Sequence, residues 1–135
     1  MASSNSDKNP LIYEDEHCVI FCDRSPKAFG HLQCVPKRHI KDWTYLKPLE
    51  SDISLLEHMY NVGREFLIKN YPSPDNQYRL GFHSPGHNSQ FHLHMHLISF
   101  PLSLPRHEKR YSGEGLTKVD QVLSELIRKF KEESL

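Results

Sequence analysis

The sequence predicts an α+β domain in which an antiparallel sheet of about five strands packs against one long central helix and a C-terminal helix. Residues 17–22 form a short β-prone run that ends at the turn sequence Asp23-Arg24-Ser25-Pro26. A second run at residues 31–35 begins after Gly30 and ends at Pro36. Because only a short loop joins the two runs, we expect them to pair as antiparallel neighbours. Residues 77–82 and 92–98 supply two further strands.

Two amphipathic stripes predict the helices. The first recurs at steps of three and four residues through 49–67, so a helix there begins at Pro48 or Ser51 and ends before Pro72. Gly63 lies on this stripe, where it either allows close approach of the sheet or costs the helix about 1 kcal/mol. A second stripe at 116–130 predicts the C-terminal helix, with Thr117 as its N-cap.

Length, charge and cysteine content describe one small domain. We expect a disordered polar leader at residues 1–9, without the apolar core of a signal peptide, and a single domain at residues 10–135. The 17 basic and 17 acidic residues balance, so overall charge indicates neither a polyanion nor a membrane surface as partner. No apolar run is long enough for a spanning helix. Three cysteines without a zinc-type pair indicate a reducing compartment, so we expect a cytoplasmic or nuclear protein.

Histidine alternates with apolar residues three times, at His92, His94 and His96. On an extended strand the three imidazoles would share one face, with neighbours about 6.5–7 Å apart. That spacing suits three groups acting on one phosphate or one metal ion. Packing alone rarely requires it, because each buried histidine would need a hydrogen-bond partner. The plain alternative is a solvated strand face that is rich in histidine.

Two blocks of the sequence resemble the histidine triad (HIT) family. The run His92-Leu93-His94-Met95-His96-Leu97-Ile98 is similar to the family motif of three histidine–apolar pairs followed by an apolar residue. Residues 21–26 and 30–40, which end in Pro36-Lys37-Arg38-His39-Ile40, resemble the family's strand–loop–strand block. The blocks occur in the family's order, with a helix of suitable length between them. The resemblance covers residues 11–100 and implies a HIT-like fold.

Residues 79–83 refine this resemblance. They are similar to the branch of histidine-triad nucleotide-binding proteins closest to aprataxin. The commoner nucleotide-binding type has an asparagine where Gly81 stands, so the ribose contact of that type lacks its donor here. The zinc finger that follows the catalytic domain of aprataxin is not expected, because residues 100–135 contain no cysteine and one histidine, His107.

The resemblance implies nucleotidyl transfer to water through a covalent intermediate. The middle histidine, His94, would attack the α-phosphorus as a neutral imidazole, and His96 would protonate the leaving group. His92 and His31 would keep the other catalytic histidines in position and bind the phosphoryl oxygens. These four histidines are the expected catalytic residues.

The same resemblance implies five substrate-binding residues. Asp23 would bind the ribose hydroxyls, and Arg24 would stack on the base or lie in solvent. Ser89 would donate its hydroxyl, and His87 and Asn88 precede it in a loop whose N–H groups could face the phosphate. The plain alternatives are an Asx turn at Asp23 and a turn residue at Ser89.

Four other positions have simpler expectations. His39 supports the fold by hydrogen bonding, and His58 is exposed on its helix. Trp43 and Tyr45 belong either to the core or to a dimer surface, and the sequence does not choose between them.

These residues favour a hydrolase or transferase that cleaves adenylylated small molecules, such as AMP phosphoramidates and aminoacyl-AMP, and releases AMP. Two related reactions stay open: removal of AMP from adenylylated DNA 5′ ends, as in aprataxin, and hydrolysis of dinucleoside polyphosphates. No basic stripe with interleaved aromatic residues favours DNA. A local patch would arise only if Lys27, Lys37, Arg38 and Arg24 converged beside His94.

A metal site and a binding module without turnover are alternatives from other classes. Strand-borne His-x-His pairs bind zinc, but the outer two histidines would lie about 13 Å apart. No acidic residue or cysteine lies in the run, so we expect no metal ligand and no cofactor. The expected partners are a small adenylylated nucleotide and a second copy of the chain in a homodimer, with nucleic acid not favoured and no membrane.

Overall fold

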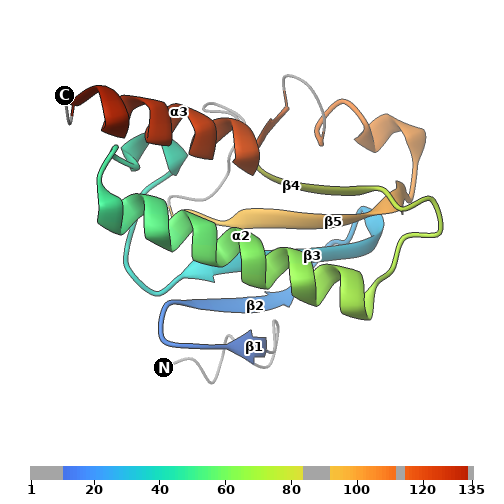
Figure 1. Cartoon of the computed structure of the whole chain (residues 1–135). Helices are drawn as coiled ribbons and strands as arrows, with labels where there is room; N and C mark the ends of the chain where they lie inside the picture. The colour runs from blue at the N-terminus through green and yellow to red at the C-terminus, as the bar shows by residue number, and fades with distance from the viewer. Residues whose placement is uncertain (1–10, 84–91, 112–114, 134–135) are drawn as a thin grey trace.

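One antiparallel sheet of six strands, in the order β1-β2-β3-β5-β4-β6, forms the centre of the fold (Figure 1). The computed structural model describes residues 11–83, 92–111 and 115–133, so the expected leader at residues 1–9 lies outside the described residues. The strands are β1 (Leu11–Glu14), β2 (Cys18–Cys22), β3 (Ala28–Pro36), β4 (Tyr78–His83), β5 (Met95–Leu102) and β6 (Leu116–Lys118). The helices are α2 (Glu50–Asn70) and α3 (Val119–Glu133), with 3-10 helices η1 (Trp43–Tyr45) and η2 (Pro105–His107). The predicted α+β class is confirmed. The sequence pattern did not indicate the strands β1 and β6, because strands this short show little alternation of polar and apolar residues.

Side-chain alternation along β3 and β5 separates the two faces of the sheet. Leu32 pairs with Leu97 across these strands, and both lie with Met95 in the core against α2. His31 and His96 occupy the alternate positions and therefore point to the opposite face. Figure 1 shows α2 crossing in front of β3 and β5. The catalytic candidates thus lie on the face of the sheet away from this helix.

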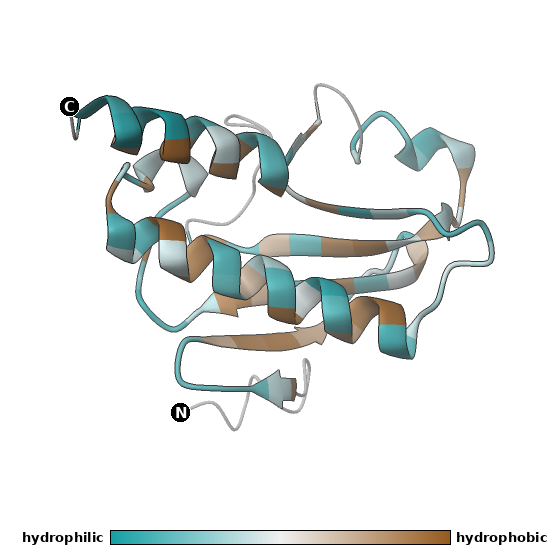
Figure 2. Ribbon diagram, viewed as in Figure 1, coloured by the Kyte–Doolittle hydropathy of each residue, from teal (hydrophilic) through white to brown (hydrophobic). Residues whose placement is uncertain are grey.

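Helix α2 turns its apolar stripe toward the sheet, as the brown and teal sides in Figure 2 show. Gly63 lies on that stripe, and a Cβ atom there would approach Cδ2 of Leu97 to 2.9 Å. The missing side chain therefore lets the helix and sheet pack in contact, which is the first of the two alternatives for this glycine. The helix begins at Glu50, and no side chain caps it at Leu49.

The C-terminal helix begins at Val119, two residues after the predicted N-cap. Thr117 lies in β6, where it pairs with Phe82, so the predicted cap is wrong. The chain stays extended through Lys118 because β6 completes the sheet edge first, and the backbone N–H of Lys118 then donates to Oε1 of Gln121 at 3.3 Å. Among the described residues, no helix has the length and hydropathy that a bilayer crossing requires.

Candidate active site

Four histidines from three neighbouring strands, or the residues directly before them, meet on the face of the sheet away from α2. His31 lies in β3, His83 in β4 and His96 in β5, and His94 directly precedes β5. The ring centroid of His96 is 4.4 Å from that of His83, 5.0 Å from that of His94 and 5.2 Å from that of His31. All four side chains are buried. The structure therefore brings together three of the four predicted catalytic histidines, and adds His83.

The hydrogen bond of His94 determines which of its ring nitrogens can attack. Nδ1 lies 3.0 Å from the backbone carbonyl oxygen of His92. Because a carbonyl oxygen only accepts, Nδ1 carries the proton and Nε2 of the neutral ring keeps its lone pair. Burial lowers the pKa of His94, so the ring is neutral at pH 7. His94 thus has the protonation state that a nitrogen nucleophile needs.

A second chain of hydrogen bonds determines the tautomer of His96. The backbone N–H of Lys27 donates to Nδ1 of His31 at 3.0 Å, which leaves the proton of a neutral His31 on Nε2. That Nε2 lies 3.0 Å from Nδ1 of His96 and donates to it. Burial lowers the pKa of His31 to about 4 and the pKa of His96 well below its usual range, so both rings are neutral. The proton of His96 is therefore on Nε2.

Nε2 of His96 is buried and has no hydrogen-bond partner among the residues that the structure describes. A buried N–H without a partner costs folding free energy, about 1–3 kcal/mol, so such groups mark places where a ligand completes the hydrogen bonding. The ring centroid of His96 lies 5.0 Å from that of His94, whose Nε2 keeps its lone pair. The two rings could offer an attacking nitrogen and a hydrogen-bond donor to one phosphate group.

The ring of His92 does not join the cluster. Its Nδ1 lies 3.0 Å from Nδ1 of His39, and its Nε2 lies 3.2 Å from the carbonyl oxygen of Pro36. The expectation of three imidazoles on one strand face is wrong, because β5 begins only at Met95. Pro36 lacks the N–H that would extend the β3–β5 ladder, and the backbone N–H of Leu93 donates to Ile40 instead. His92 serves the site through its backbone carbonyl, and His39 supports the fold by hydrogen bonding, as expected.

Asp23 forms the Asx turn that was the plain alternative to ribose binding, and its second carboxylate oxygen faces the histidines. Its Oδ1 accepts from the backbone N–H of Ser25 at 2.8 Å, which is the Asx turn. Its Oδ2 accepts from Nε2 of Gln33 at 2.8 Å and lies 3.4 Å from Nε2 of His31. The carboxylate is thus held at the edge of the histidine cluster, where a ribose diol could reach it. Arg24 is exposed beside it.

Two further residues of the site, His83 and Tyr111, were not predicted from the sequence. Nδ1 of His83 donates to the carbonyl oxygen of Gly115 at 3.1 Å. The Tyr111 ring is 4% exposed, with its centroid 5.2 Å from His31, 5.2 Å from His83 and 5.5 Å from His96. Its phenol pKa is raised by burial. The signal for His83 was its place directly before the loop to the triad, whereas Tyr111 lies in a segment without sequence periodicity.

Trp43 contacts the site from the other side. It lines a small hollow next to Phe82, His83, His92 and His94, and its Nε1 is buried with no hydrogen-bond partner in the described part of the chain. The ring packs against the core, so of the two aromatic residues considered for a dimer surface only Tyr45 is exposed. The predicted phosphate-binding residues His87, Asn88 and Ser89 lie outside the described residues.

Gly81 has no room for the asparagine of the commoner nucleotide-binding type. A Cβ atom at residue 81 would lie 2.7 Å from the carbonyl oxygen of Thr117 and 2.8 Å from Cγ of Leu116. Strand β6 therefore occupies the space that a ribose-binding side chain would need. Of the ribose contacts that the resemblance implies, Asp23 is the one whose side chain the structure places at the site.

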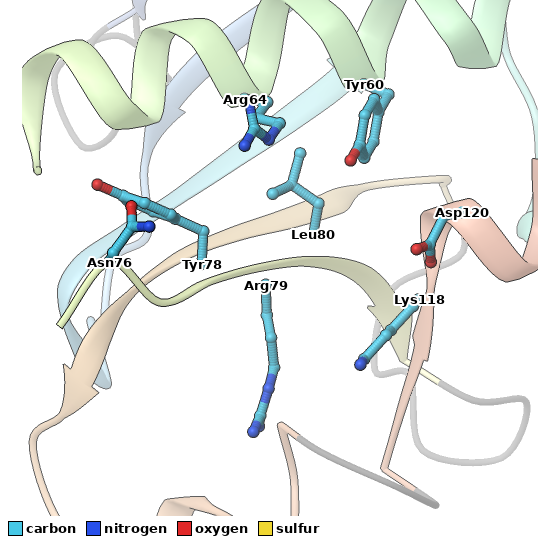
Figure 3. A pocket seen from close by; sticks show the side chains of 8 residues that line it. All are labelled: Tyr60, Arg64, Asn76, Tyr78, Arg79, Leu80, Lys118 and Asp120. Carbon is cyan, nitrogen blue, oxygen red and sulfur yellow. The ribbon is translucent and has the colours of Figure 1, made fainter. Parts of the chain in front are cut away.

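A separate hollow of about 230 Å³ lies at the edge of β4 (Figure 3). Figure 3 shows Tyr60 and Arg64 facing it from α2, while the side chain of Arg79 points away. Arg79 instead donates from Nη1 to the carbonyl oxygen of Tyr111 at 2.8 Å, which holds that ring over the histidines. Because no histidine lines this hollow, it is not the catalytic pocket.

The only donors close enough to hold a metal ion at the described part of the site are Asp23, His31 and His96. The same atoms form the hydrogen-bond chain from His31 to His96, so a metal would displace the proton between the two rings. The triad histidines as a set do not converge on one point, because His92 turns toward His39. A zinc site made of the three triad histidines is therefore excluded by geometry.

The fold and these histidines define a histidine triad protein, and the chain belongs to that family. A family model described as "Scavenger mRNA decapping enzyme C-term binding" matches residues 2–112. Among curated relatives, the bifunctional adenosine 5'-phosphosulfate phosphorylase/adenylylsulfatase HINT4 of Arabidopsis thaliana is 38% identical over 67% of this chain and 61% of its own length. Adenosine 5'-monophosphoramidase HINT3 of Danio rerio is 36% identical over 66% of this chain and 54% of its own.

Aprataxin of Gallus gallus is 30% identical over 95% of this chain and 40% of its own length. The chain thus spans between 40% and 61% of these three relatives. A HIT family hydrolase from Clostridium thermocellum superposes with a TM-score of 0.61 at 24% identity, over 77% of this chain and 90% of that chain. Hnt3 in complex with DNA and guanosine superposes with a TM-score of 0.65 at 22% identity, over 92% of this chain and 72% of that chain. These structures confirm the predicted HIT-like fold.

Proposed function

We propose that this protein cleaves adenylylated small molecules between the α-phosphorus and the leaving group, and releases AMP. The observation that carries the proposal is the pair of tautomers in two neighbouring rings: Nε2 of His94 has a lone pair, and Nε2 of His96 has an N–H without a partner among the described residues. Relatives named a monophosphoramidase and an adenylylsulfatase support the same class of substrate.

The proposed reaction has two displacement steps. Nε2 of His94 attacks the α-phosphorus, the bond from phosphorus to the leaving group breaks, and a nucleotidyl-histidine forms. The bound phosphate anion raises the proton affinity of His96, so its protonated ring can give the Nε2 proton to the leaving group. Water then attacks the same phosphorus, returns a proton to His96, and releases AMP from His94. Asp23 holds the ribose hydroxyls through both steps.

The test compares AMP release from four substrates by the purified protein: an AMP phosphoramidate, adenylyl sulfate, a dinucleoside polyphosphate and adenylylated nicked DNA. The proposal expects the highest kcat/KM with one of the first two, and a nucleotide adduct on His94 after rapid acid quench. Absence of AMP release from every small substrate would reject it.

Adenylylated DNA ends are the second candidate substrate, because aprataxin is among the relatives. Two of the four cations considered for a local basic patch are paired with carboxylates instead: Lys37 pairs with Glu14 at 2.7 Å, and Arg38 pairs with Asp52 at 2.6 Å. Lys27 and Arg110 are the cations whose charges act on the catalytic histidines. Two cations suit one small anion better than a duplex backbone.

Salt dependence separates the two substrate classes. Each phosphate that the protein neutralises on duplex DNA contributes about −0.9 to the slope of log affinity against log salt. For a protein that binds one nucleotide, we expect no detectable nicked-duplex binding at about 0.15 M salt, where the screening length is about 8 Å. Tight binding to nicked duplex with a steep salt slope would establish the DNA substrate instead.

We further propose that the chain forms a homodimer and works in the cytoplasm or nucleus. Tyr45 is 53% exposed next to α2 and provides aromatic surface for a second copy. A solution mass near 15.8 kDa at micromolar concentration would reject the dimer. The proposed location rests on the three cysteines, which form no disulfide with one another and would suit a reducing compartment. Imaging of the tagged protein tests the location.

A further inference from the structure

Three side chains of metal-binding types converge at the turn between β1 and β2. Asp15 lies in this turn, Cys18 begins β2, and His58 comes from α2. Nε2 of His58 lies 2.7 Å from Oδ2 of Asp15, and Sγ of Cys18 lies 3.9 Å from the same oxygen. All three ligand atoms lie within 4.8 Å of one another. Cys18 shares the face of Leu32 and Cys34, so the cluster lies on the helix side of the sheet, away from the catalytic histidines.

The carboxylate of Asp15 is rigidly held and ionised. Its Oδ1 accepts from the backbone N–H groups of His17 at 2.8 Å and Cys18 at 3.0 Å, so Oδ2 faces the other donors. Although burial opposes the charged form, these bonds and those from Tyr13 and His58 hold the pKa of Asp15 well below its usual range. His58, expected to be exposed, is half-buried because it makes this bond. The cluster therefore contains one fixed negative charge.

Three protons point at one oxygen in this arrangement. The Tyr13 hydroxyl, the His58 imidazole N–H and the Cys18 thiol all face Oδ2 of Asp15. We propose that a zinc ion binds here, with Oδ2 of Asp15, Sγ of Cys18 and Nε2 of His58 as its protein ligands and water in the fourth position. Oxygen, nitrogen and sulfur donors together suit zinc, which accepts all three in tetrahedral geometry.

The distances between the three ligand atoms fit tetrahedral zinc after small movements of the side chains. Zinc bonds of about 2.0–2.3 Å place tetrahedral ligand atoms roughly 3.3–3.8 Å apart. The Asp15–Cys18 separation of 3.9 Å is close to this range, and the Asp15–His58 separation of 2.7 Å must widen as the hydrogen bond is replaced. His58 is half-exposed at the helix surface, so its ring can shift without disturbing the core.

The charges balance as well. Zinc binding releases the thiol proton of Cys18 to solvent, and the proton of His58 moves from Nε2 to Nδ1 through solvent. The ion, one carboxylate and one thiolate then sum to zero, which a partly buried site can accommodate. The Tyr13 hydroxyl, 2.7 Å from Oδ2, stays as an outer hydrogen bond that orients the carboxylate. The ion would cross-link the β1–β2 turn to α2.

Cobalt titration of the metal-free full-length protein tests this site. We expect one equivalent of Co²⁺ to produce a thiolate-to-cobalt charge-transfer band together with the intense visible bands of four-coordinate cobalt. Cobalt at the catalytic cluster of Asp23, His31 and His96 would give no such band, because that cluster contains no thiol. Absence of the band at excess cobalt would overturn the proposal, and it would leave the proposed catalytic function untouched.

Matched variants identify the ligands. Cys18→Ser and His58→Gln should each abolish the charge-transfer band. Cys22→Ser, on the same strand with its thiol 4.0 Å from the Tyr71 hydroxyl, and His17→Gln should retain it. A band that survives both ligand variants, or that Cys34→Ser removes while Cys18→Ser does not, would overturn the assigned ligand set.

Thermal unfolding provides a second readout if Cys18→Ser fails to fold. The Tm of the wild-type protein should rise with the logarithm of the zinc concentration, because zinc binds the folded state. In His58→Gln, whose side chain lies at the helix surface, that rise should disappear. A wild-type Tm that does not respond to zinc would contradict the site.

Discussion

The backbone carbonyl oxygen of His92 accepts a hydrogen bond from Nδ1 of His94 at 3.0 Å. This bond places the proton of His94 on the nitrogen away from the substrate and leaves the Nε2 lone pair for attack. The first histidine of the triad therefore acts through its backbone, while its ring is engaged with His39 and Pro36.

Replacing His94 by alanine should abolish turnover and leave the fold intact. The side chain supplies the attacking nitrogen and little packing, so we expect kcat to fall by at least about 10³-fold. Mass spectrometry after acid quench should find no nucleotide on the variant. His17→Ala, at an exposed ring, is the matched control. Normal turnover in His94→Ala would contradict the mechanism.

Loss of His96 should depend on the leaving group. Without its proton donor the enzyme must expel a basic leaving atom unaided, so His96→Asn should lower kcat about 10²–10⁴-fold with an AMP phosphoramidate. An adenylyl ester with an acidic leaving group needs no such proton, and its rate should fall much less. Equal losses with both substrates would assign His96 to binding instead.

Activity should persist below the pH at which an exposed histidine becomes protonated. Burial lowers the pKa of His94, so the nucleophile stays neutral as the pH falls through about 6.5, the value of an exposed histidine. The acid limb of the kcat/KM profile should therefore lie below pH 6.5. A profile measured with substrate well under KM checks this, and an inflection at or above 6.5 would show that His94 is not the titrating group.

Stability should fall as the solution is acidified from about pH 6.5 to pH 4. The pKa of His31 is lowered to about 4 in the folded chain, whereas in the unfolded chain it is near 6.5. Below pH 6.5 the unfolded chain takes up a proton that the folded chain refuses, at a cost of up to about 3 kcal/mol by pH 4. Urea unfolding at several pH values measures this, and the free energy of unfolding of His31→Gln should depend less steeply on pH than that of the wild-type protein. His17→Gln is the matched control.

Gly81→Ala should destabilise the fold more than Gly63→Ala. At residue 81 the new Cβ would meet the carbonyl oxygen of Thr117 at 2.7 Å, and backbone cannot move aside cheaply. We expect a loss of about 1–3 kcal/mol in the free energy of unfolding. At residue 63 the neighbour is the end of the Leu97 side chain, and alanine also favours the helix by about 1 kcal/mol. Denaturant titration compares the two variants. A Gly81→Ala variant that is more stable than Gly63→Ala would contradict the close contact with the carbonyl oxygen of Thr117.

Local patterns carried most of the fold prediction. The period of the apolar stripe placed α2 to within a residue or two of its observed start, and β-prone runs bounded by turn residues placed β2 and β3. Residue alternation failed at His92, because the end of β3 at Pro36, far away in the sequence, decides where β5 can begin. The prediction from local patterns also failed at Thr117, whose capping preference yields to pairing with β4.

The sequence by itself determined the class of fold and the presence of His31, His94 and His96 in one site, because residue alternation and the two sequence blocks are properties of short segments. Only the tertiary structure decided which nitrogen of each ring carries the proton, since Lys27 and His92 act there through backbone atoms. It also decided that His83 and Tyr111 enclose the cluster and that Asp15, Cys18 and His58 meet on the other face. Those contacts join segments that are distant in the chain, and no local pattern records them.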